Sequence, residues 1–516
     1  MAGIGFELKK LFGHRGALAT LRAYGYAGIV CTGPMLMSIG LLVGLRVLST
    51  LTGADHHTQD LLVSMVTYCL LGSLVLTSSL SMVTTRFTAD MLYEERTNEV
   101  LPSFYGSLVL QLGVGAIGFI IFLLFSGVSV WYQALCLVLF CEFIIVWTQI
   151  NYLTAIKDYR SILIYFASGV VTAMLVGAVG LFLLKLDTIS VLMCAVILGY
   201  GVMMSGFFVL LHRYFPRCKS SSFSFLGWID KYPALLFVGI FLGAGLFGHL
   251  VITWTGPLGV QVEGLFYGAP QYDIPAIMAF LSLLVTTINF TVSVEVNFYP
   301  WYKQFISLFN AGGALSDIEM AETEMLQVLR REMVYLAYRQ FVVTVLFIVV
   351  GTTILVSSGL GMTEAMLGTY RVLCVGYGLY AVANSIMLIQ LYFSDNTGAF
   401  WSALVFAIAS IGGTIGFLFA DTVYYGFGFL IGGALMYLVA WLRLWRYTKK
   451  LQHHTLSSQP VLLQAANGPF TRLGNFLNRH SESVNDQRQW KLIARFRQQR
   501  RAVGARTNRR GTGLTK

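Results

Sequence analysis

The stretch from Thr287 to Phe298, TINFTVSVEVNF, decides the fold class of this chain. From Thr291 onward polar and apolar side chains alternate, which is the pattern of a half-buried β-strand. The stretch lies, however, inside a much longer apolar block. A lone strand in lipid leaves its backbone N–H and C=O groups unpaired, so only helices and closed barrels cross a bilayer. We therefore predict a helix here and treat the alternation as misleading.

The composition of the whole chain supports a membrane location for this block. The chain has 516 residues, of which 56% are hydrophobic and 11% charged, whereas a soluble domain carries about 25% charged residues. The apolar residues gather in blocks of about 20, enough to cross a ~30 Å hydrocarbon core at about 1.5 Å per residue. We predict an all-α polytopic membrane protein with about twelve transmembrane helices, at roughly 24–49, 60–84, 103–126, 129–155, 161–184, 188–211, 233–255, 274–299, 336–359, 368–393, 398–420 and 424–446.

Lysine and arginine fall almost entirely on alternate connections between these blocks. One set of connections is rich in both, from Lys9 and Lys10 near the N-terminus to Lys449 and Lys450 after the last block. The other set holds only Arg46, Lys185 and Arg371, each at the edge of a block. Basic connections of membrane proteins face the cytoplasm. We therefore expect a multi-pass protein of the cytoplasmic (inner) membrane, with both termini cytoplasmic.

The connections also divide the chain into segments. A basic linker at 212–232 separates two sets of six helices, at 24–211 and 233–450. Residues 1–23 mix charged and apolar side chains at helical spacing, which is typical of an amphipathic segment on the cytoplasmic membrane surface. Residues 451–516 are polar and rich in arginine, which predicts a largely disordered cytoplasmic tail. The tail fits either an anionic lipid surface or a protein partner, and we expect no binding of nucleic acid.

Ionisable groups at membrane depth are expensive and usually face a cavity. Glu142 lies near the middle of the fourth block, with Gln149 two turns along the same helix face. Glu295 lies near the basic end of the eighth block, on one stripe with Thr291. Each carboxylate also has a simpler explanation, without a role in transport. Glu142 could make a structural hydrogen bond to a neighbouring helix, and Glu295 could lie in a solvated mouth or pair with Lys or Arg.

The tenth block adds two neutral polar side chains, Asn384 and Gln390. Together with the four residues above they form our candidates for a substrate route. The sequence shows no enzyme signature, such as a phosphate-binding loop or a His-Glu-x-x-His motif, so we expect neither catalysis nor a cofactor or metal. A charged helix in the connection 300–335 carries Arg330 and Arg331. It is either a solvated face or a docking surface for a cytoplasmic partner.

Several stretches resemble one known family over about residues 1–450. They are MAGIGFELKKLF at the N-terminus, EFIIVWTQINYLTAIKDYR around Glu142, the eighth block with NFYPWYKQF after it, and LYFSDNTGAFWSAL after Gln390. This pattern is similar to the Pel exopolysaccharide export membrane proteins, the PelG family. The family belongs to the multidrug/oligosaccharidyl-lipid/polysaccharide flippase superfamily. One departure is Ser394–Asn396, where the family pattern is basic and this chain has Asp395.

The resemblance implies two six-helix bundles around a central cavity. It also implies that the chain moves Pel-type, amino-sugar-containing polysaccharide across the cytoplasmic membrane. The implied partners are a cytoplasmic glycosyltransferase and small membrane subunits of an exopolysaccharide synthase. Two alternatives stay open. One is a small-molecule multidrug or metabolite antiporter of the same superfamily. The other is a membrane glycosyltransferase or polymer ligase, for which the predicted external connections are short.

Overall fold

The computed structural model describes residues 17–154, 159–216, 221–310, 312–357, 361–457 and 468–479. Most of the predicted amphipathic segment 1–23 lies outside these residues.

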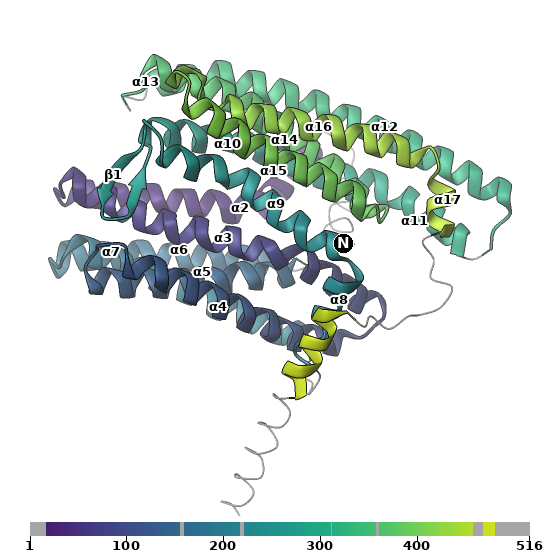
Figure 1. The fold of residues 1–516 in the computed structure, drawn as a ribbon, viewed down its shortest axis with the longest axis horizontal. Coiled ribbons are helices and arrows are strands. Elements are labelled where there is room, and N and C mark those ends of the chain that lie inside the picture. Colours follow the sequence, from purple (N-terminus) through teal and green to yellow (C-terminus); the bar gives the residue numbers. More distant parts are fainter. Residues whose placement is uncertain are drawn as a thin grey trace, which may run out of the picture.

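The long helices form two layers, drawn in purple to blue and in teal to green in Figure 1. The first bundle contains α2 (Ala17–Leu51), α3 (His56–Tyr93), α4 (Val100–Leu124), α5 (Val130–Leu153), α6 (Tyr159–Ala178) and α7 (Thr188–Tyr214). The second contains α9 (Pro233–Trp254), α10 (Pro270–Val292), α12 (Leu315–Leu346), α14 (Glu364–Tyr392), α15 (Asn396–Leu418) and α16 (Phe427–Thr448).

Shorter elements connect or extend the long helices. They are η1 (Thr97–Glu99), η2 (Val179–Leu183), α8 (Leu226–Lys231), β1 (Val260–Glu263), β2 (Phe266–Gly268), η3 (Ser293–Phe298), α11 (Tyr299–Asn310), η4 (Phe347–Gly351), α13 (Thr352–Ser357), η5 (Thr422–Tyr424) and α17 (Leu451–Ser457). A further helix covers residues 469–479.

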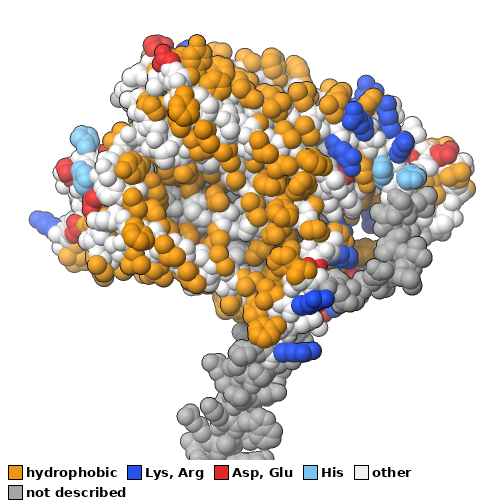
Figure 2. Space-filling view, in the orientation of Figure 1, with side chains coloured by type: hydrophobic (Ala, Val, Ile, Leu, Met, Phe, Trp, Pro, Cys, Tyr) orange, Lys and Arg blue, Asp and Glu red, His pale blue; other side chains and the backbone are white. Residues whose placement is uncertain are grey.

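The predicted fold class is confirmed. Within the described residues, eleven helices are long and apolar enough to cross a membrane. Helix α2 supplies the remaining predicted span, with an apolar portion at Leu36–Leu51. Figure 2 shows hydrophobic side chains over much of the visible face, with most of the visible Lys and Arg at one end. We call that end, which carries α8, α11 and α17, the basic end.

The stretch Thr287–Phe298 is helical, as predicted. Helix α10 continues into η3, which is a turn of π-helix, and then into α11. The backbone N–H of Tyr299 donates to the carbonyl of Val294, five residues back. Pro300 explains this wider turn, because proline has no N–H and its ring clashes with the carbonyl four residues before it. The alternating pattern therefore falls on a distorted helix, and π-turns of this kind are frequent at functional sites.

The two bundles touch along α3 and α9, where small residues allow the backbones to approach. A Cβ atom on Gly239 of α9 would stand 2.1 Å from the carbonyl oxygen of Ser78 of α3. Gly243, one turn later, faces the hydroxyl of the same serine. Glycines four residues apart allow close helix packing in membranes, where contact rather than the hydrophobic effect drives association.

A β-hairpin joins the two bundles at the end opposite the basic end. Strands β1 and β2 pair antiparallel, and the Leu265 N–H between them donates to the carbonyl of Ser126 at 2.9 Å. The Tyr267 N–H donates to the hydroxyl of Tyr68 on α3 at 3.0 Å. Phe266 is fully buried, with its ring centroid 5.0 Å from that of Tyr68 and 5.6 Å from that of Phe122. Residues of the second half of the chain thus complete the core of the first bundle.

The C-terminal segment differs from the predicted disordered tail in the part that the structure describes. Residues 451–457 and 469–479 are helical. The second of these helices is held by the Asp230 side chain and the Phe223 backbone N–H of the linker between the bundles, which the sequence pattern of the tail alone does not reveal.

Candidate functional site

Two buried glutamines occupy corresponding places in the two bundles. Gln149 of α5 donates from Nε2 to the carbonyl of Met204 on α7 at 3.0 Å. Gln390 of α14 donates from Nε2 to the carbonyl of Ala440 on α16 at 2.8 Å. Both side chains are fully buried. Each contact joins the fourth and sixth long helices of its bundle, as expected for two parallel repeats. The two glutamines therefore hold helix pairs together.

Glu142 lies two turns before Gln149 on α5 and is half-buried. Its Oε1 lies 3.6 Å from the position of a Cβ on Gly201, so the carboxylate faces α7. Its Oε2 is buried and has no hydrogen-bond partner among the described residues. An unsatisfied buried polar group costs about 1–3 kcal/mol, and more when it is charged. Oε2 therefore does not make the hydrogen bond to a neighbouring helix that was the alternative explanation for Glu142. This oxygen is available to a proton or a ligand.

The remaining route candidates lie on the second bundle. Thr291 is half-buried on α10, and its hydroxyl donates to the carbonyl of Thr287 at 2.9 Å. Asn384 is half-buried on α14 and lies six residues before Gln390. In the first bundle, Glu142 lies seven residues before Gln149. The backbone of Glu295 lies in η3, and its side chain is outside the described part of the structure. Two of the six candidates, Glu142 and Gln149, thus belong to the first bundle and the other four to the second.

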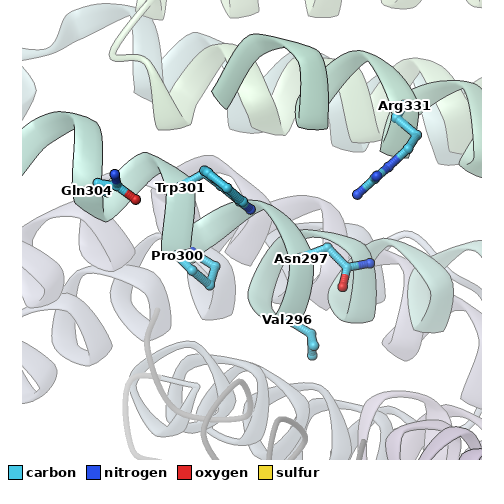
Figure 3. Close-up of a pocket in the computed structure, with 6 residues that line it drawn as sticks. All are labelled: Val296, Asn297, Pro300, Trp301, Gln304 and Arg331. Atoms are coloured by element: carbon cyan, nitrogen blue, oxygen red, sulfur yellow. The ribbon is translucent and has the colours of Figure 1, made fainter. Parts of the chain in front are cut away.

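A pocket of about 360 Å³ opens beside η3 at the basic end. It is lined by Val296, Asn297, Pro300, Trp301, Gln304 and Arg331. Figure 3 shows Trp301 of α11 and Arg331 of α12 pointing toward one another, with Asn297 between them. The volume is within the usual range of ligand pockets, about 300–1,000 Å³. An indole, two amides and a guanidinium meet here. The sequence analysis missed this pocket, although Pro300–Trp301 directly follows the polar stripes of the eighth block.

A second pocket of about 510 Å³ lies on α12. It is lined by Gln327, Val328, Arg330, Arg331, Val334 and Tyr335. Both arginines are exposed, and Arg331 is 3.7 Å from the carboxylate of the adjacent Glu332. In Figure 1 the α11–α12 pair extends beyond the other long helices at the basic end. The two arginines predicted to contact a partner are therefore exposed on the surface of α12.

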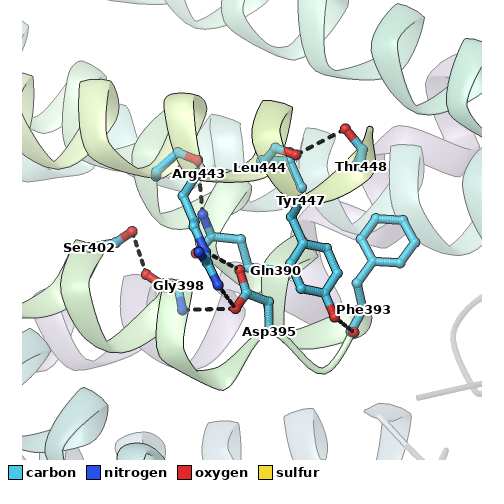
Figure 4. A network of polar contacts seen from close by, with 10 residues as sticks. Gln390, Phe393, Asp395, Gly398, Ser402, Arg443, Leu444, Tyr447 and Thr448 are labelled. Atoms are coloured by element: carbon cyan, nitrogen blue, oxygen red, sulfur yellow. Dashed lines mark hydrogen bonds and ion pairs between the residues drawn. The ribbon is translucent and has the colours of Figure 1, made fainter. Parts of the chain in front are cut away.

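Asp395, where the resemblance led us to expect a basic residue, belongs to a buried network shown in Figure 4. Its Oδ1 accepts from the Gly398 N–H at 3.0 Å and from Nη2 of Arg443 at 2.8 Å, and its Oδ2 accepts from Nε of Arg443 at 2.7 Å. Only 3% of the Asp395 side chain is exposed, against 41% of Arg443. Asp395 thus caps α15 and ties it to α16, which is a structural role.

Two bundles of long apolar helices define the chain as a multi-pass membrane protein, and solved structures share this fold. A MATE family multidrug resistance transporter in an outward-facing conformation is similar in structure, with 12% identity, 83% of this chain and 96% of that chain covered, and a TM-score of 0.57. A MATE protein in a bent conformation is also similar, with 12% identity, 84% of this chain and 97% of that chain covered, and a TM-score of 0.57. A third similar structure is a MOP superfamily transporter from Pyrococcus furiosus Vc1 (DSM3638), described as having a binding pocket of reverse polarity. It has 11% identity, 83% of this chain and 96% of that chain covered, and a TM-score of 0.55. At these identities the likeness shows the fold alone.

The amino-acid sequence identifies the family of the chain. The model of the PelG family, described as "Putative exopolysaccharide Exporter (EPS-E)", matches residues 1–456, and the chain belongs to this family. No curated protein matches the chain. The chain is therefore a membrane transporter and not an enzyme, which removes the glycosyltransferase alternative.

Proposed function

We propose that this chain moves a Pel-type, amino-sugar-containing polysaccharide across the cytoplasmic membrane, entering at the basic end. The observation that carries this proposal is the pocket between α11 and α12 in a member of an exporter family. A sugar ring has an apolar face and a rim of hydroxyl groups. The Trp301 indole offers an apolar surface, and Asn297, Gln304 and Arg331 offer hydrogen-bonding groups around it.

The orientation follows from the charges. Lysine and arginine gather at the basic end, and such residues favour the cytoplasmic side. Both termini are then cytoplasmic, and the β-hairpin that joins the bundles lies on the external side. A polymer made in the cytoplasm reaches the Trp301 pocket before it reaches the helices at membrane depth.

Glu142 supplies the charged point of the proposed route. Amino sugars with free amines are cationic, and a carboxylate at depth offsets part of the cost of bringing them into a low-dielectric passage. Glu295 near the mouth would act earlier and more weakly, because that end is closer to water. Thr291 and Asn384 add neutral hydrogen-bonding groups. Gln149 and Gln390 each hold a neighbouring helix through Nε2, while the Oε1 of each is buried without a hydrogen-bond partner among the described residues.

The unpaired oxygen of Glu142 also favours a second candidate, which is coupling of transport to a proton or another cation. A small-molecule multidrug or metabolite antiporter would use such a group, and the structural neighbours include multidrug transporters. We prefer the polysaccharide because the family match covers residues 1–456, while the likeness to those transporters shows only the fold.

We further propose that the exposed surface of α12 around Arg330 and Arg331 docks the cytoplasmic glycosyltransferase of the synthase, with small membrane subunits nearby. Arg330 and Arg331 are exposed there beside the apolar surface of Val334 and Tyr335. Arginine and tyrosine are enriched at protein interfaces. Docking at this place would deliver the growing polymer beside the Trp301 pocket, because Arg331 lines both pockets.

One paired experiment tests binding and docking separately. Trp301→Ala is expected to lower polymer export about three- to tenfold, equivalent to roughly 0.7–1.4 kcal/mol of lost contact, with normal synthase co-purification. Arg330→Glu, outside the Trp301 pocket, is expected to weaken co-purification while the protein stays at its normal membrane level. Export and co-purification are measured for both variants. Trp445→Ala removes another exposed tryptophan of the basic end and serves as the matched control. Wild-type export by Trp301→Ala would contradict a sugar site in this pocket.

A further inference from the structure

The helix at residues 469–479 lies beyond the residues that the family model matches. It follows α17, which packs on the second bundle through Leu451, yet it lies on the first bundle. Figure 1 shows it in yellow beside α8, with its axis running steeply across those of the long helices. A helix in this orientation at the end of a bundle lies along a membrane surface rather than through the membrane.

The side of this helix that faces the bundle is held by specific polar contacts. Asp230 of α8 accepts hydrogen bonds from the N–H and the hydroxyl of Thr471, both at 2.6 Å, and from the Phe470 N–H at 3.3 Å. Burial raises the pKa of the Asp230 carboxyl, but these bonds outweigh burial and hold its pKa below the ordinary value. At the other end, the Phe223 N–H donates to Oδ1 of Asn478 at 3.1 Å. The helix therefore has a defined rotation on the linker.

The opposite side of the helix is apolar and exposed. Phe470, Leu473 and Phe476 are three residues apart and have exposed fractions of 37%, 45% and 67%. Arg472 and Arg479 are exposed on the same helix, and residues 469–479 contain no Asp or Glu. An apolar stripe flanked by basic residues is typical of helices that lie in the interface of an anionic membrane.

The depth of the docking site agrees with that location. The linker packs against the first turns of α4, where the carbonyl of Ser222 lies 1.9 Å from the position of a Cβ on Gly106. Helix α4 has 25 residues, which is about 38 Å at 1.5 Å per residue and exceeds a ~30 Å hydrocarbon core. Gly106 is six residues, about 9 Å, from the start of α4, so the linker that holds the helix at 469–479 packs near one edge of the hydrocarbon core.

We propose that the helix at 469–479 is a membrane anchor whose apolar stripe inserts among the headgroups of an anionic lipid surface. Arg472 and Arg479 would bind lipid phosphates, each contributing about 1 kcal/mol near such a surface. The rest of the tail, 480–516, carries eight further arginines and two lysines against two acidic residues in the sequence, so its charge has the same sign. Because Asp230 holds the other side of the helix, the anchor fixes the inter-bundle linker to the membrane surface.

The test is hydrogen–deuterium exchange of the full chain in nanodiscs. One lipid is phosphatidylcholine, and the other is phosphatidylcholine mixed with anionic phosphatidylglycerol. We expect the amides of 469–479 to exchange about tenfold more slowly in the anionic lipid, and this difference to shrink at high salt. The double change Leu473→Ser and Phe476→Ser should abolish the difference while the contact with Asp230 persists. The neighbouring exposed change Asn475→Ser should leave it intact.

Three results would overturn the proposal. Equal exchange in the two lipids would show that anionic lipid does not bind the helix. Protection that rises with protein concentration in either lipid would identify a second copy of the chain as the occupant of the apolar stripe. Protection that requires added synthase would identify a protein partner instead.

Discussion

Replacing Glu142 by Gln is expected to lower polysaccharide export about tenfold while leaving the amount of protein in the membrane unchanged. The change keeps the shape of the side chain and removes its charge. Its Oε2 is buried without a hydrogen-bond partner among the described residues, so little of the fold depends on that oxygen. In a passage of low dielectric, a lost attraction of about 1.4 kcal/mol is sufficient for a tenfold effect. Export of polymer from cells and immunodetection of the protein measure the two quantities.

The controls separate charge at depth from charge at the surface. Glu364→Gln removes an exposed carboxylate at the start of α14 and should leave export within about twofold of wild type, since a surface charge at a helix N-terminus contributes only about 0.3–1 kcal/mol to stability. Glu295→Gln should have a smaller effect than Glu142→Gln. Normal export by the double variant Glu142→Gln with Glu295→Gln would refute both the carboxylate route and cation coupling through Glu142.

The nature of the polymer distinguishes the two roles of Glu142. If the carboxylate attracts free amines, a fully N-acetylated polymer should be exported equally well by wild type and Glu142→Gln. If the carboxylate couples transport to a proton or cation, the variant should lose export of both polymers and its dependence on the ion gradient.

Breaking the buried pair of Asp395 and Arg443 is expected to have the largest effect on stability. Arg443→Ala leaves the carboxylate of Asp395 buried without its main partner, and removing one member of a buried pair costs about 3–5 kcal/mol. We expect about 3 kcal/mol, the low end of that range, because Arg443 is 41% exposed and water partly screens the pair. The expected results are a lower thermal midpoint in detergent and less protein in the membrane.

The neighbouring Arg446 provides the control for this pair. It lies three residues further along α16, is exposed, and carries the same charge. Arg446→Ala should change the thermal midpoint little, because exposed charges contribute about 0–1 kcal/mol. Equal midpoints for the two variants would show that the contacts around Asp395 in Figure 4 do not stabilise the fold.

The sequence was sufficient to predict the helices because a lipid environment allows few spanning structures. Every backbone polar group must be paired within the spanning element, so the strand-like alternation of Thr291–Phe298 still had to be helical. The same stretch did not reveal the π-turn at η3, although Pro300 was visible five residues after Glu295. The capping role of Asp395 is also predictable from the sequence, since aspartate is a favourable residue at the N-cap of a helix. Its partner Arg443 is 48 residues away and depends on tertiary packing.

Other features depend on contacts that no local pattern encodes. Whether Gln149 and Gln390 face a passage or a neighbouring helix depends on the rotation of α5 and α14, and both face a neighbour. The hairpin of β1 and β2 has strands of four and three residues and depends on the first bundle for its contacts. The helix at 469–479 is also too short to be stable alone, since isolated helices below about 12–15 residues are marginal in water. Asp230 supplies its cap from a distant part of the sequence.

Polysaccharide transport by this chain can be measured in inside-out membrane vesicles that contain the chain and its synthase. The vesicles are supplied outside with radiolabelled nucleotide sugars. The measured quantity is the fraction of labelled polymer that survives glycosidase added to the outside. We predict that most polymer becomes resistant with the wild-type chain, much less with Glu142→Gln, and none in vesicles that lack the chain. An equal resistant fraction with and without the chain would show that the chain does not carry the polymer across the membrane.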